Sequence, residues 1–351
     1  MLKYSLKRVV LAFVTAFIIL TLTFFLVKTL SSRYLKVVST DENVVYAFYM
    51  EQHKLGYVTY IQKPITEHFI PNVTPLDSIK IGRYEYFFFV TPIHQQYFRW
   101  LGNIVTKWNW GTSTVIEPGA SALFIIAQQL PATVKVNVVS VIVSVPLGIA
   151  LGILAGLKKN TWVDHLISTL VMVFISIPSF VVISFLMHWL CYQAQILPPA
   201  WPRPDETLGT KVLAYFIPVM SLSFGSICGY TRFVRAELCE VMSSEYLLLA
   251  RTKGLTKNQA IVRHALRNAF VPILPSILAE FIGVFGGSMI LESLYDIPGI
   301  GRLYIRALNN YDYNVLLVDM AIFTTVGLLA GIILDLSYGF IDPRIRMGEK
   351  K

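Results

Sequence analysis

The chain has 351 residues, of which 55% are hydrophobic and only 15% are charged, and its mean hydropathy is +0.59. This balance excludes an ordinary soluble domain, in which about a quarter of the residues carry charge. The formal net charge of +9 would suit either a nucleic-acid-binding protein or a membrane protein, so the positions of the basic residues must decide. The three cysteines lie in or beside apolar stretches, without the spacing of a disulfide framework or a zinc site.

Six apolar stretches are long enough to cross a bilayer, which takes about 20 residues in a helix. They cover approximately residues 9–30, 134–157, 165–191, 212–231, 269–293 and 313–339. The first begins like a signal peptide but exceeds the usual apolar core in length, and no cleavage pattern follows it. We therefore expect a retained membrane helix there, and an all-α polytopic membrane protein with about six transmembrane helices.

The positions of lysine and arginine orient these helices, because short cytoplasmic loops favour both residues. If the N-terminus is inside, that side holds Lys3, Lys7, Arg8, Lys158, Lys159, Arg232, Arg235, Arg251, Lys253, Lys257, Arg263, Arg267, Arg344, Arg346, Lys350 and Lys351. The short outer loops hold only Arg203, Lys211, Arg302 and Arg306. Both termini are thus predicted to be cytoplasmic. No nucleic-acid partner is expected, since no basic face is interleaved with aromatic residues.

This orientation divides the chain into four predicted parts. Residues 1–30 hold the first helix, 31–118 form a small extracytoplasmic domain, 119–343 form the transmembrane domain and 344–351 are a cytoplasmic tail. The stretch from Val115 to Leu130 contains Glu117 and Pro118, so we expect it to lie along the outer interface rather than to span the bilayer.

The predicted outer domain reads as short strands, because its aromatic and β-branched residues partly alternate with polar ones. The three candidate segments are residues 44–50 (VVYAFYM), 56–62 (GYVTYIQ) and 79–90 (IKIGRYEYFFFV), with a turn at 54–56. The sequence gives this domain no readable role.

Glycines recur every four residues in several spans, a spacing that lets another helix approach one face closely. Gly148, Gly152 and Gly156 form the longest series. The pairs are Gly225 with Gly229, Gly283 with Gly287, and Gly327 with Gly331. Glycine is frequent in membrane helices, so a single pair indicates little. The repetition in four spans predicts a compact bundle.

The stretch 243–268, between the fourth and fifth spans, is rich in basic residues and must lie outside the membrane. Ser243 or Ser244 can cap a first short helix, and Gly254 falls where a left-handed residue would end it. Thr256 and Gln259 have the spacing of a capping box for a second helix. The sequence thus predicts a helix, an elbow and a second helix on the cytoplasmic side.

Two runs in this elbow, residues 250–255 (ARTKGL) and 263–268 (RHALRN), resemble the cytoplasmic EAA loop of ABC importer permeases of the dipeptide/oligopeptide branch. In that family the loop docks as a coupling helix on a separate ATPase subunit. The chain departs from the general pattern at Leu248 and Leu249, where Glu and Ala would stand. The resemblance assigns ATPase coupling to Glu245, Ala250, Arg251, Lys253, Gly254, Arg263, His264, Arg267 and Asn268.

Further signatures of the same family occur in the expected order. Residues 97–101 (YFRWL) and 111–113 (GTS) are similar to a pattern before the second span, and 290–303 (ILESLYDIPGIGRL) is similar to an outer loop. Residues 340–346 (FIDPRIR) resemble the terminal D-P-R motif. The resemblance covers residues 97–346, and residues 31–96 share none of it.

The sequence contains no nucleotide-binding P-loop and no hydrolase or metalloprotease motif, so we expect no enzymatic activity, cofactor or metal in this chain. Glu280 lies in the fifth span, where a carboxylate costs a few kcal/mol unless it meets water or a partner. It either lines a substrate path, or it pairs with a basic group on another helix or stays protonated. Glu292 and Asp296, near the outer mouth, are further candidates for contacts with the cationic end of a peptide.

The resemblance implies a multi-pass permease in a prokaryotic cell membrane. Its partners would be membrane lipid, a second homologous permease subunit, two ATPase subunits or domains that bind ATP and Mg²⁺, and an extracytoplasmic substrate-binding protein. The expected substrates are di- or oligopeptides, with nickel or another small solute as the alternative. An ion-coupled secondary transporter should show inverted repeats, and a membrane-anchored sensor would not need five further spans, so we rank both lower.

Overall fold

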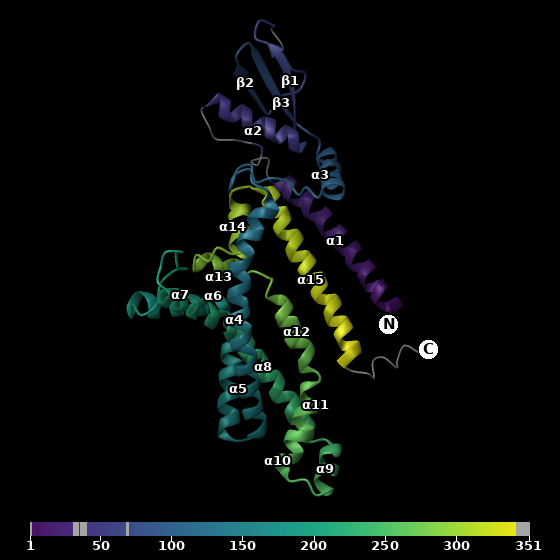
Figure 1. Ribbon diagram of the computed structural model, residues 1–351, viewed down its shortest axis with the longest axis vertical. Helices are drawn as coiled ribbons and strands as arrows, with labels where there is room; N and C mark the ends of the chain where they lie inside the picture. The colour runs from purple at the N-terminus through teal and green to yellow at the C-terminus, as the bar shows by residue number, and fades with distance from the viewer. Residues whose placement is uncertain (1, 31–34, 36–40, 68–69, 342–351) are drawn as a thin grey trace. The chain divides into compact units, whose positions relative to one another are not determined.

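The computed structural model describes residues 2–30, 35, 41–67 and 70–341 (Figure 1). Two compact units emerge. The sheet unit comprises residues 14–128 and 304–322, and the bundle unit comprises the described residues of 1–13, 129–303 and 323–351. Residues 342–346 of the terminal motif lie outside the described residues.

The bundle unit is helical. Its complete helices are α5 (Trp162–Ile175), α6 (Ser179–Leu186), the π-helix η2 (Met187–Gln193), α7 (Leu208–Ala214), α8 (Phe216–Met242), α9 (Glu245–Thr252), α10 (Lys257–Ala260), the π-helix η3 (Ile261–Ala265), α11 (Leu266–Phe270), α12 (Ile273–Gly283) and α13 (Met289–Leu294). Four helices contribute residues to both units: α1 (Leu2–Leu30), α4 (Ala122–Leu157), α14 (Ile300–Asn309) and α15 (Tyr313–Ile341).

The predicted spans are present as helices, although two of them are bent. Among the described residues, four stretches are long and apolar enough to cross a membrane: Leu6–Thr29, Ala122–Leu157, Leu208–Met242 and Tyr313–Ser337. Two bent pairs bring the number to six if each pair is one span: Trp162–Ile175 with Ser179–Gln193, and Lys257–Phe270 with Ile273–Gly283. The expected fold class, a mostly helical polytopic membrane protein, is thus confirmed. Its orientation stays a prediction.

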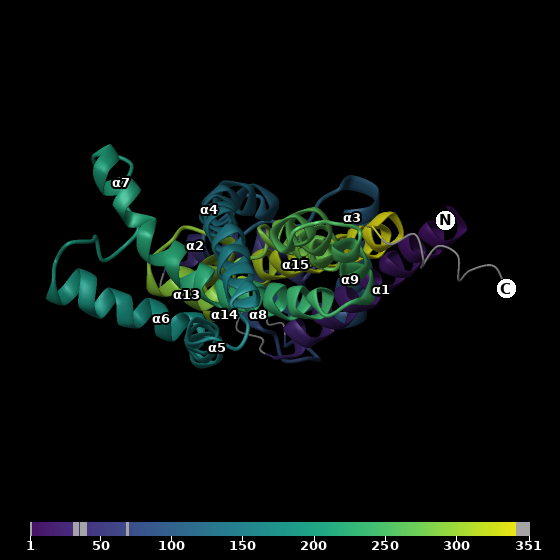
Figure 2. The ribbon, with the colours of Figure 1, turned by 90° about the horizontal axis from the view of Figure 1, so that it is seen from below.

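The span predicted over 165–191 is a bent pair, in which α5 and the stretch formed by α6 and η2 meet at 97° (Figures 1 and 2). Pro178 stands directly before α6 with extended backbone angles. A proline disfavours helical geometry in the residue that precedes it, so the chain leaves α5 at Ile175 and starts again at Ser179.

Two predicted boundaries also shift. The fifth span ends at Gly283, and α13 is a separate short helix after the glycines at 286 and 287, so the range 269–293 was too long. The helix α4 begins at Ala122, so residues 122–130 continue without a break into the second predicted span. Glu117 and Pro118 interrupt only the residues before it.

The glycine series of α4 is the contact surface with α8. A Cβ added at Gly148 would lie 2.6 Å from Cβ of Tyr230, and one at Gly152 would lie 2.6 Å from Cβ of Val234. The same atom at Gly156 would lie 3.0 Å from Leu238. The predicted close helix approach is therefore confirmed for α4. At the other paired positions, only Gly287 has atoms within 4 Å of an added Cβ in the part of the chain that the structure describes.

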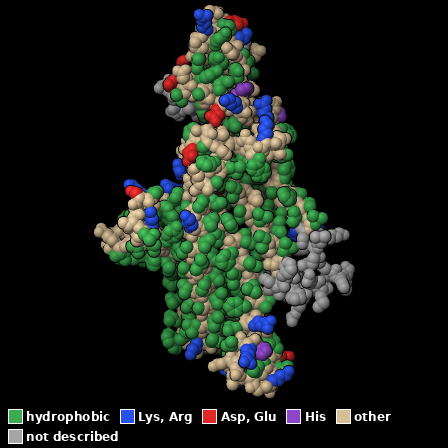
Figure 3. Space-filling model, in the orientation of Figure 1, with side chains coloured by type: hydrophobic (Ala, Val, Ile, Leu, Met, Phe, Trp, Pro, Cys, Tyr) green, Lys and Arg blue, Asp and Glu red, His purple; other side chains and the backbone are tan. Residues whose placement is uncertain are grey.

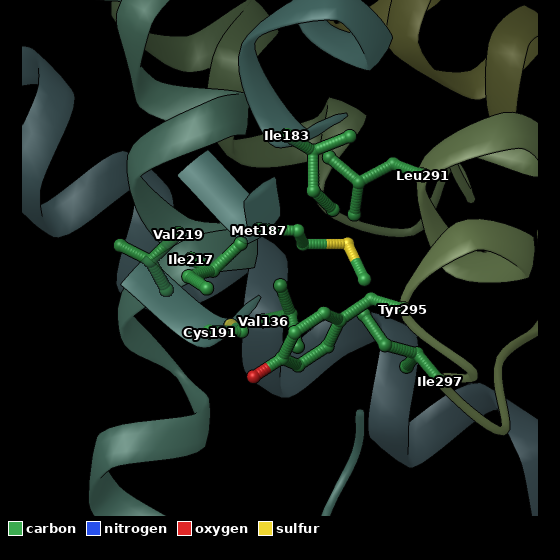
Figure 4. Packing of buried hydrophobic residues seen from close by; sticks show 9 residues of the cluster. All are labelled: Val136, Ile183, Met187, Cys191, Ile217, Val219, Leu291, Tyr295 and Ile297. Atoms are coloured by element: carbon green, nitrogen blue, oxygen red, sulfur yellow. The ribbon is translucent and has the colours of Figure 1, made fainter. Parts of the chain in front are cut away.

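A buried apolar cluster joins α4, α6, η2 and α8 to α13 (Figure 4). Its members are Val136, Ile183, Met187, Cys191, Ile217, Val219, Leu291, Tyr295 and Ile297. Tyr295 is fully buried, and its hydroxyl donates a hydrogen bond to the carbonyl of Pro198 at 2.7 Å. This cluster fixes the segment after α12 against the bundle.

The sheet unit contains α2 (Glu42–Leu55), α3 (Ile93–Lys107) and three antiparallel strands in the order β1-β3-β2: β1 (Val58–Pro64), β2 (Asp77–Ile81) and β3 (Tyr84–Val90). The strand predicted at 56–62 is present as β1, whereas the segment predicted at 79–90 forms two strands, β2 and β3, joined by a turn at Gly82 and Arg83. Helix α2 lies along the sheet (Figure 1), and Tyr49 stacks on Phe88.

The strand predicted at residues 44–50 is wrong, because this segment belongs to α2. Asp41 caps the helix by accepting a hydrogen bond from the N–H of Asn43, and Gly56 ends it with a left-handed φ of 85°. Val45, Tyr49 and Gln52 are buried at helical spacing. The two caps and this spacing override the β-propensity of the valines and aromatics.

Candidate functional site

The elbow between α8 and α12 has the predicted local structure. Gly254 has a φ of 95°, and its N–H donates to the carbonyl of Arg251 at 3.0 Å. Thr256 and Gln259 form the reciprocal capping box at the start of α10. Ser244 occupies the N-cap position of α9, but its hydroxyl donates to the carbonyl of Val241 instead of capping α9. The elbow is therefore defined mainly by its central turn.

The inner face of the elbow packs on the ends of two long helices. Leu247 of α9 and Ile261 of η3 are buried together with Leu238 of α8. Ile153 of α4 and Met242 of α8 complete this apolar contact. Because this interface is buried and close-packed, it attaches α9 and η3 to the ends of α4 and α8.

The outer face of the elbow exposes the predicted coupling residues. Exposed positions are Glu245, Arg251, Lys253, Gly254, Arg263, His264, Arg267 and Asn268, whereas Ala250 is half-buried. Blue Lys and Arg side chains gather on this part of the surface, while hydrophobic side chains cover the neighbouring helices of the bundle unit (Figure 3). The elbow thus presents a cationic surface on a fixed support.

Two leucines on the same surface, Leu248 and Leu249, were not among the predicted coupling residues. Leu248 and Leu249 are 62% and 56% exposed, although they stand on a helix with a buried inner face. The sequence shows that both depart from the family pattern. Their exposure became clear only from the structure, in which the neighbouring Leu247 is the residue that packs inward. Exposed apolar side chains that adjoin charged ones are typical of a docking surface.

A polar cavity of about 430 Å³ lies between α4, α8 and α12 in the bundle unit. Its wall includes Asn137, Ser140, Ser144, Ser226, Glu280 and Ser288. A neighbouring cavity of about 340 Å³ shares Ser226, Ala279 and Glu280. Cavities of this size hold small organic ligands.

Glu280 lines both cavities and is held by neutral donors. The Ser226 hydroxyl donates to its Oε1 at 2.5 Å, and the Tyr230 hydroxyl lies 3.5 Å from its Oε2. The single proton of the Tyr230 hydroxyl is shared with the carbonyl of Ser276, which lies nearer, at 3.0 Å. The structure describes no ion pair of Glu280 with a lysine or arginine along residues 2–341 outside the undescribed gaps.

Glu292 has a different environment from Glu280. It is only 4% exposed, and its two oxygens accept hydrogen bonds from the Thr133 hydroxyl at 2.9 Å and from the Arg302 N–H at 3.0 Å. Thr133 in turn accepts the N–H of Ile300 at 3.0 Å. Glu292 therefore anchors the start of α14, which explains the close packing around Gly299 and Gly301.

Asp296 carries an exposed carboxylate that is paired with the guanidinium of Arg302. Of the three predicted path residues, Glu280 alone lines either of these two cavities. Glu292 and Asp296 do not join Glu280 in these cavities, and a substrate contact for them stays a prediction.

Comparison with known proteins places the chain among transporters. Residues 148–347 match the family described as binding-protein-dependent transport system inner membrane component. The dipeptide transport system permease protein DppB of Lactococcus lactis subsp. cremoris is 30% identical over 348 residues, which is 99% of this chain and 100% of that protein. The oligopeptide transport system permease protein OppB of Haemophilus influenzae is 29% identical over 255 residues, which cover 73% of this chain and 81% of that protein.

A solved structure of the MetNI methionine ABC transporter, in inward-facing conformations, has a similar fold. The TM-score is 0.50 at 16% identity, with 63% of this chain and 97% of that chain covered. At this identity the likeness concerns the fold alone.

Proposed function

This chain belongs to the family of binding-protein-dependent transport system inner membrane components, and we propose that it is a permease subunit of an ATP-driven importer of di- or oligopeptides. It forms part of the translocation pathway and takes its energy from a separate ATPase. The sequence has no phosphate-binding P-loop of its own.

The observation that carries this proposal is the elbow. Its outer surface combines exposed cations with Leu248 and Leu249, while its inner face is packed on α4 and α8 through Leu238 and Leu247. A partner that binds the outer surface therefore moves the ends of two membrane-length helices directly. This is the mechanical connection that an importer needs between ATP hydrolysis and the opening of its pathway.

The proposed assembly contains a second homologous permease subunit, two ATPase subunits or domains that bind ATP and Mg²⁺, and an extracytoplasmic binding protein. The elbows dock on the ATPases in the cytoplasm, and the binding protein delivers substrate from the other side. The substrate class follows from the relatives, whose names specify dipeptide and oligopeptide transport.

Purification from native membranes in mild detergent tests the docking step. We expect a nucleotide-hydrolysing subunit to co-elute with the chain and to be lost in the Leu248→Glu variant, because a buried carboxylate would oppose an apolar contact. Leu208→Glu is the matched control, since Leu208 is 78% exposed at the start of α7. Equal co-elution from both variants would contradict docking through the elbow.

Transport is tested with the complete complex and its binding protein in proteoliposomes. We expect the vesicles to take up radiolabelled Ala-Ala only when ATP is present on the side of the membrane where the ATPases are bound. Uptake without a nucleotide-hydrolysing partner would refute the proposed function.

A further inference from the structure

We propose that the cavity beside Glu280 binds the protonated amino terminus of the transported peptide. This inference rests on the proposed function and assigns a chemical role to one site within it. A peptide α-amino group has a pKa of about 7.7–8.0, so it is largely an ammonium ion at neutral pH.

Glu280 lines a cavity and forms no ion pair with a lysine or arginine among the described residues, unlike three other acids of the bundle unit. Asp164, Asp296 and Asp335 form ion pairs with Arg235, Arg302 and Arg8. Glu292 is buried, with its oxygens taken by Thr133 and a backbone N–H. Glu280 has only the hydroxyls of Ser226 and Tyr230 and opens to a cavity. A carboxylate at membrane depth favours a cationic partner, and the described residues supply none.

Three polar side chains of the cavity wall donate their protons to fixed acceptors. Asn137 Nδ2 donates to the carbonyls of Val284 and Gly286, both at 2.8 Å. The hydroxyl of Ser140 donates to the carbonyl of Val136 at 2.9 Å, and that of Ser226 donates to Glu280. Each of these side chains therefore offers only oxygen lone pairs to a ligand.

A cavity that presents acceptors and a carboxylate selects a ligand that consists of donors and carries positive charge. An ammonium group has three N–H donors and no acceptor, so it satisfies the site. A carboxylate or phosphate would be repelled by the like charge of the Glu280 carboxylate. The volume of about 430 Å³ leaves space for the first residues of a peptide beside the ammonium group.

Uptake of Ala-Ala by the complete complex in proteoliposomes gives the first test. We expect Glu280→Gln to lower the uptake rate about tenfold, which corresponds to the loss of one charge-assisted hydrogen bond, and Glu280→Asp to retain part of it. Asp205→Asn, at an exposed acid before α7, should transport at the wild-type rate. Wild-type uptake by Glu280→Gln would overturn the inference alone. Failure of the unmodified complex to take up Ala-Ala would overturn the proposed function as well.

A second test does not depend on substituting Glu280. In the Ser288→Cys variant, a thiol reagent should label the cavity wall, and excess Ala-Ala or Ala-Ala-amide should slow the labelling at least fivefold. N-acetyl-Ala-Ala, which lacks the ammonium group, should not protect. Protection by the acetylated peptide or by sodium chloride alone, or no protection by Ala-Ala, would overturn the inference.

Discussion

Asp164 at the start of α5 and Arg235 on α8 form a bidentate ion pair in the bundle unit. The Arg235 Nε lies 2.5 Å from Oδ1 of Asp164, and Nη2 lies 2.9 Å from Oδ2. Asp164 is fully buried and also accepts the N–H of Asn160 at 2.9 Å and the hydroxyl of Ser168 at 3.2 Å. The pair thus fixes the beginning of α5 to α8, the helix that leads into the elbow.

We expect Arg235→Met to destabilise the complex by about 3–5 kcal/mol, because it leaves the Asp164 carboxylate buried and uncompensated. Asp164→Asn should cost less, because the Arg235 side chain that it leaves unpaired is 32% exposed. Thermal unfolding of the purified complex measures the loss. The exposed pair of Lys63 with Glu67 is the control, and Glu67→Gln should cost less than about 0.5 kcal/mol. Similar losses in the two pairs would contradict the role given to burial.

The α4–α8 contact predicts that two glycines respond differently to the same change. Gly152→Ala should destabilise the protein by about 1–3 kcal/mol, because its new Cβ would lie 2.9 Å from the Thr231 carbonyl and 2.6 Å from Val234. Gly225→Ala adds the same group to α8 with nothing within 4 Å, and alanine has the better helix propensity. We expect this control to be neutral or stabilising in the same unfolding experiment. The reverse order would contradict the packing.

Local signals predicted the parts of the fold that depend on nearby residues. The elbow was predictable because its turn needs a left-handed residue at 254 and a capping box at 256–259, and both are readable in the sequence. The 97° bend after Ile175 also has a local cause, because Pro178 lies within the predicted span.

The roles of the acidic residues needed the tertiary structure. The sequence placed Glu280 and Glu292 in one apolar region, but did not show that Thr133, far away in α4, bonds Glu292. The β-propensity of residues 44–50 favoured a strand there, although Asp41 stands where it can cap a helix. In each case the deciding hydrogen bond involves a residue outside the segment itself.

The turn at Gly254 predicts a strain effect without a clash. A Cβ at this position meets nothing within 4 Å, but a φ of 95° is unfavourable for a β-branched residue. Gly254→Val should therefore distort the elbow, leave membrane insertion intact and lower uptake per ATP hydrolysed severalfold. Gly254→Asn is the control, because asparagine tolerates the left-handed region. Wild-type uptake per ATP in the valine variant would refute the coupling role of the turn.

In the sheet unit, the carboxylate of Asp312 organises the segment 113–116. Asp312 is fully buried and accepts hydrogen bonds from the Ser113 hydroxyl at 2.5 Å and from the N–H groups of Thr114, Val115 and Ile116 at 3.0–3.3 Å. Several backbone N–H groups converge on one anion, as in an anion-binding nest. This contact gives the glycine-threonine-serine run at 111–113 a structural role.

We expect Asp312→Asn to loosen this segment, because the amide has one acceptor fewer and turns N–H donors toward N–H donors. The loss is about 2–4 kcal/mol, as for a buried charged acceptor that is removed from its donors. Amide hydrogen exchange of residues 113–121 in the intact complex should rise at least tenfold. Asn310→Ala, which removes an exposed amide two positions away that bonds the Arg306 carbonyl, should leave this exchange unchanged. Unchanged protection in Asp312→Asn would mean that the segment is held by its own turn, since the N–H of Gly119 also bonds the Ser113 carbonyl at 3.0 Å.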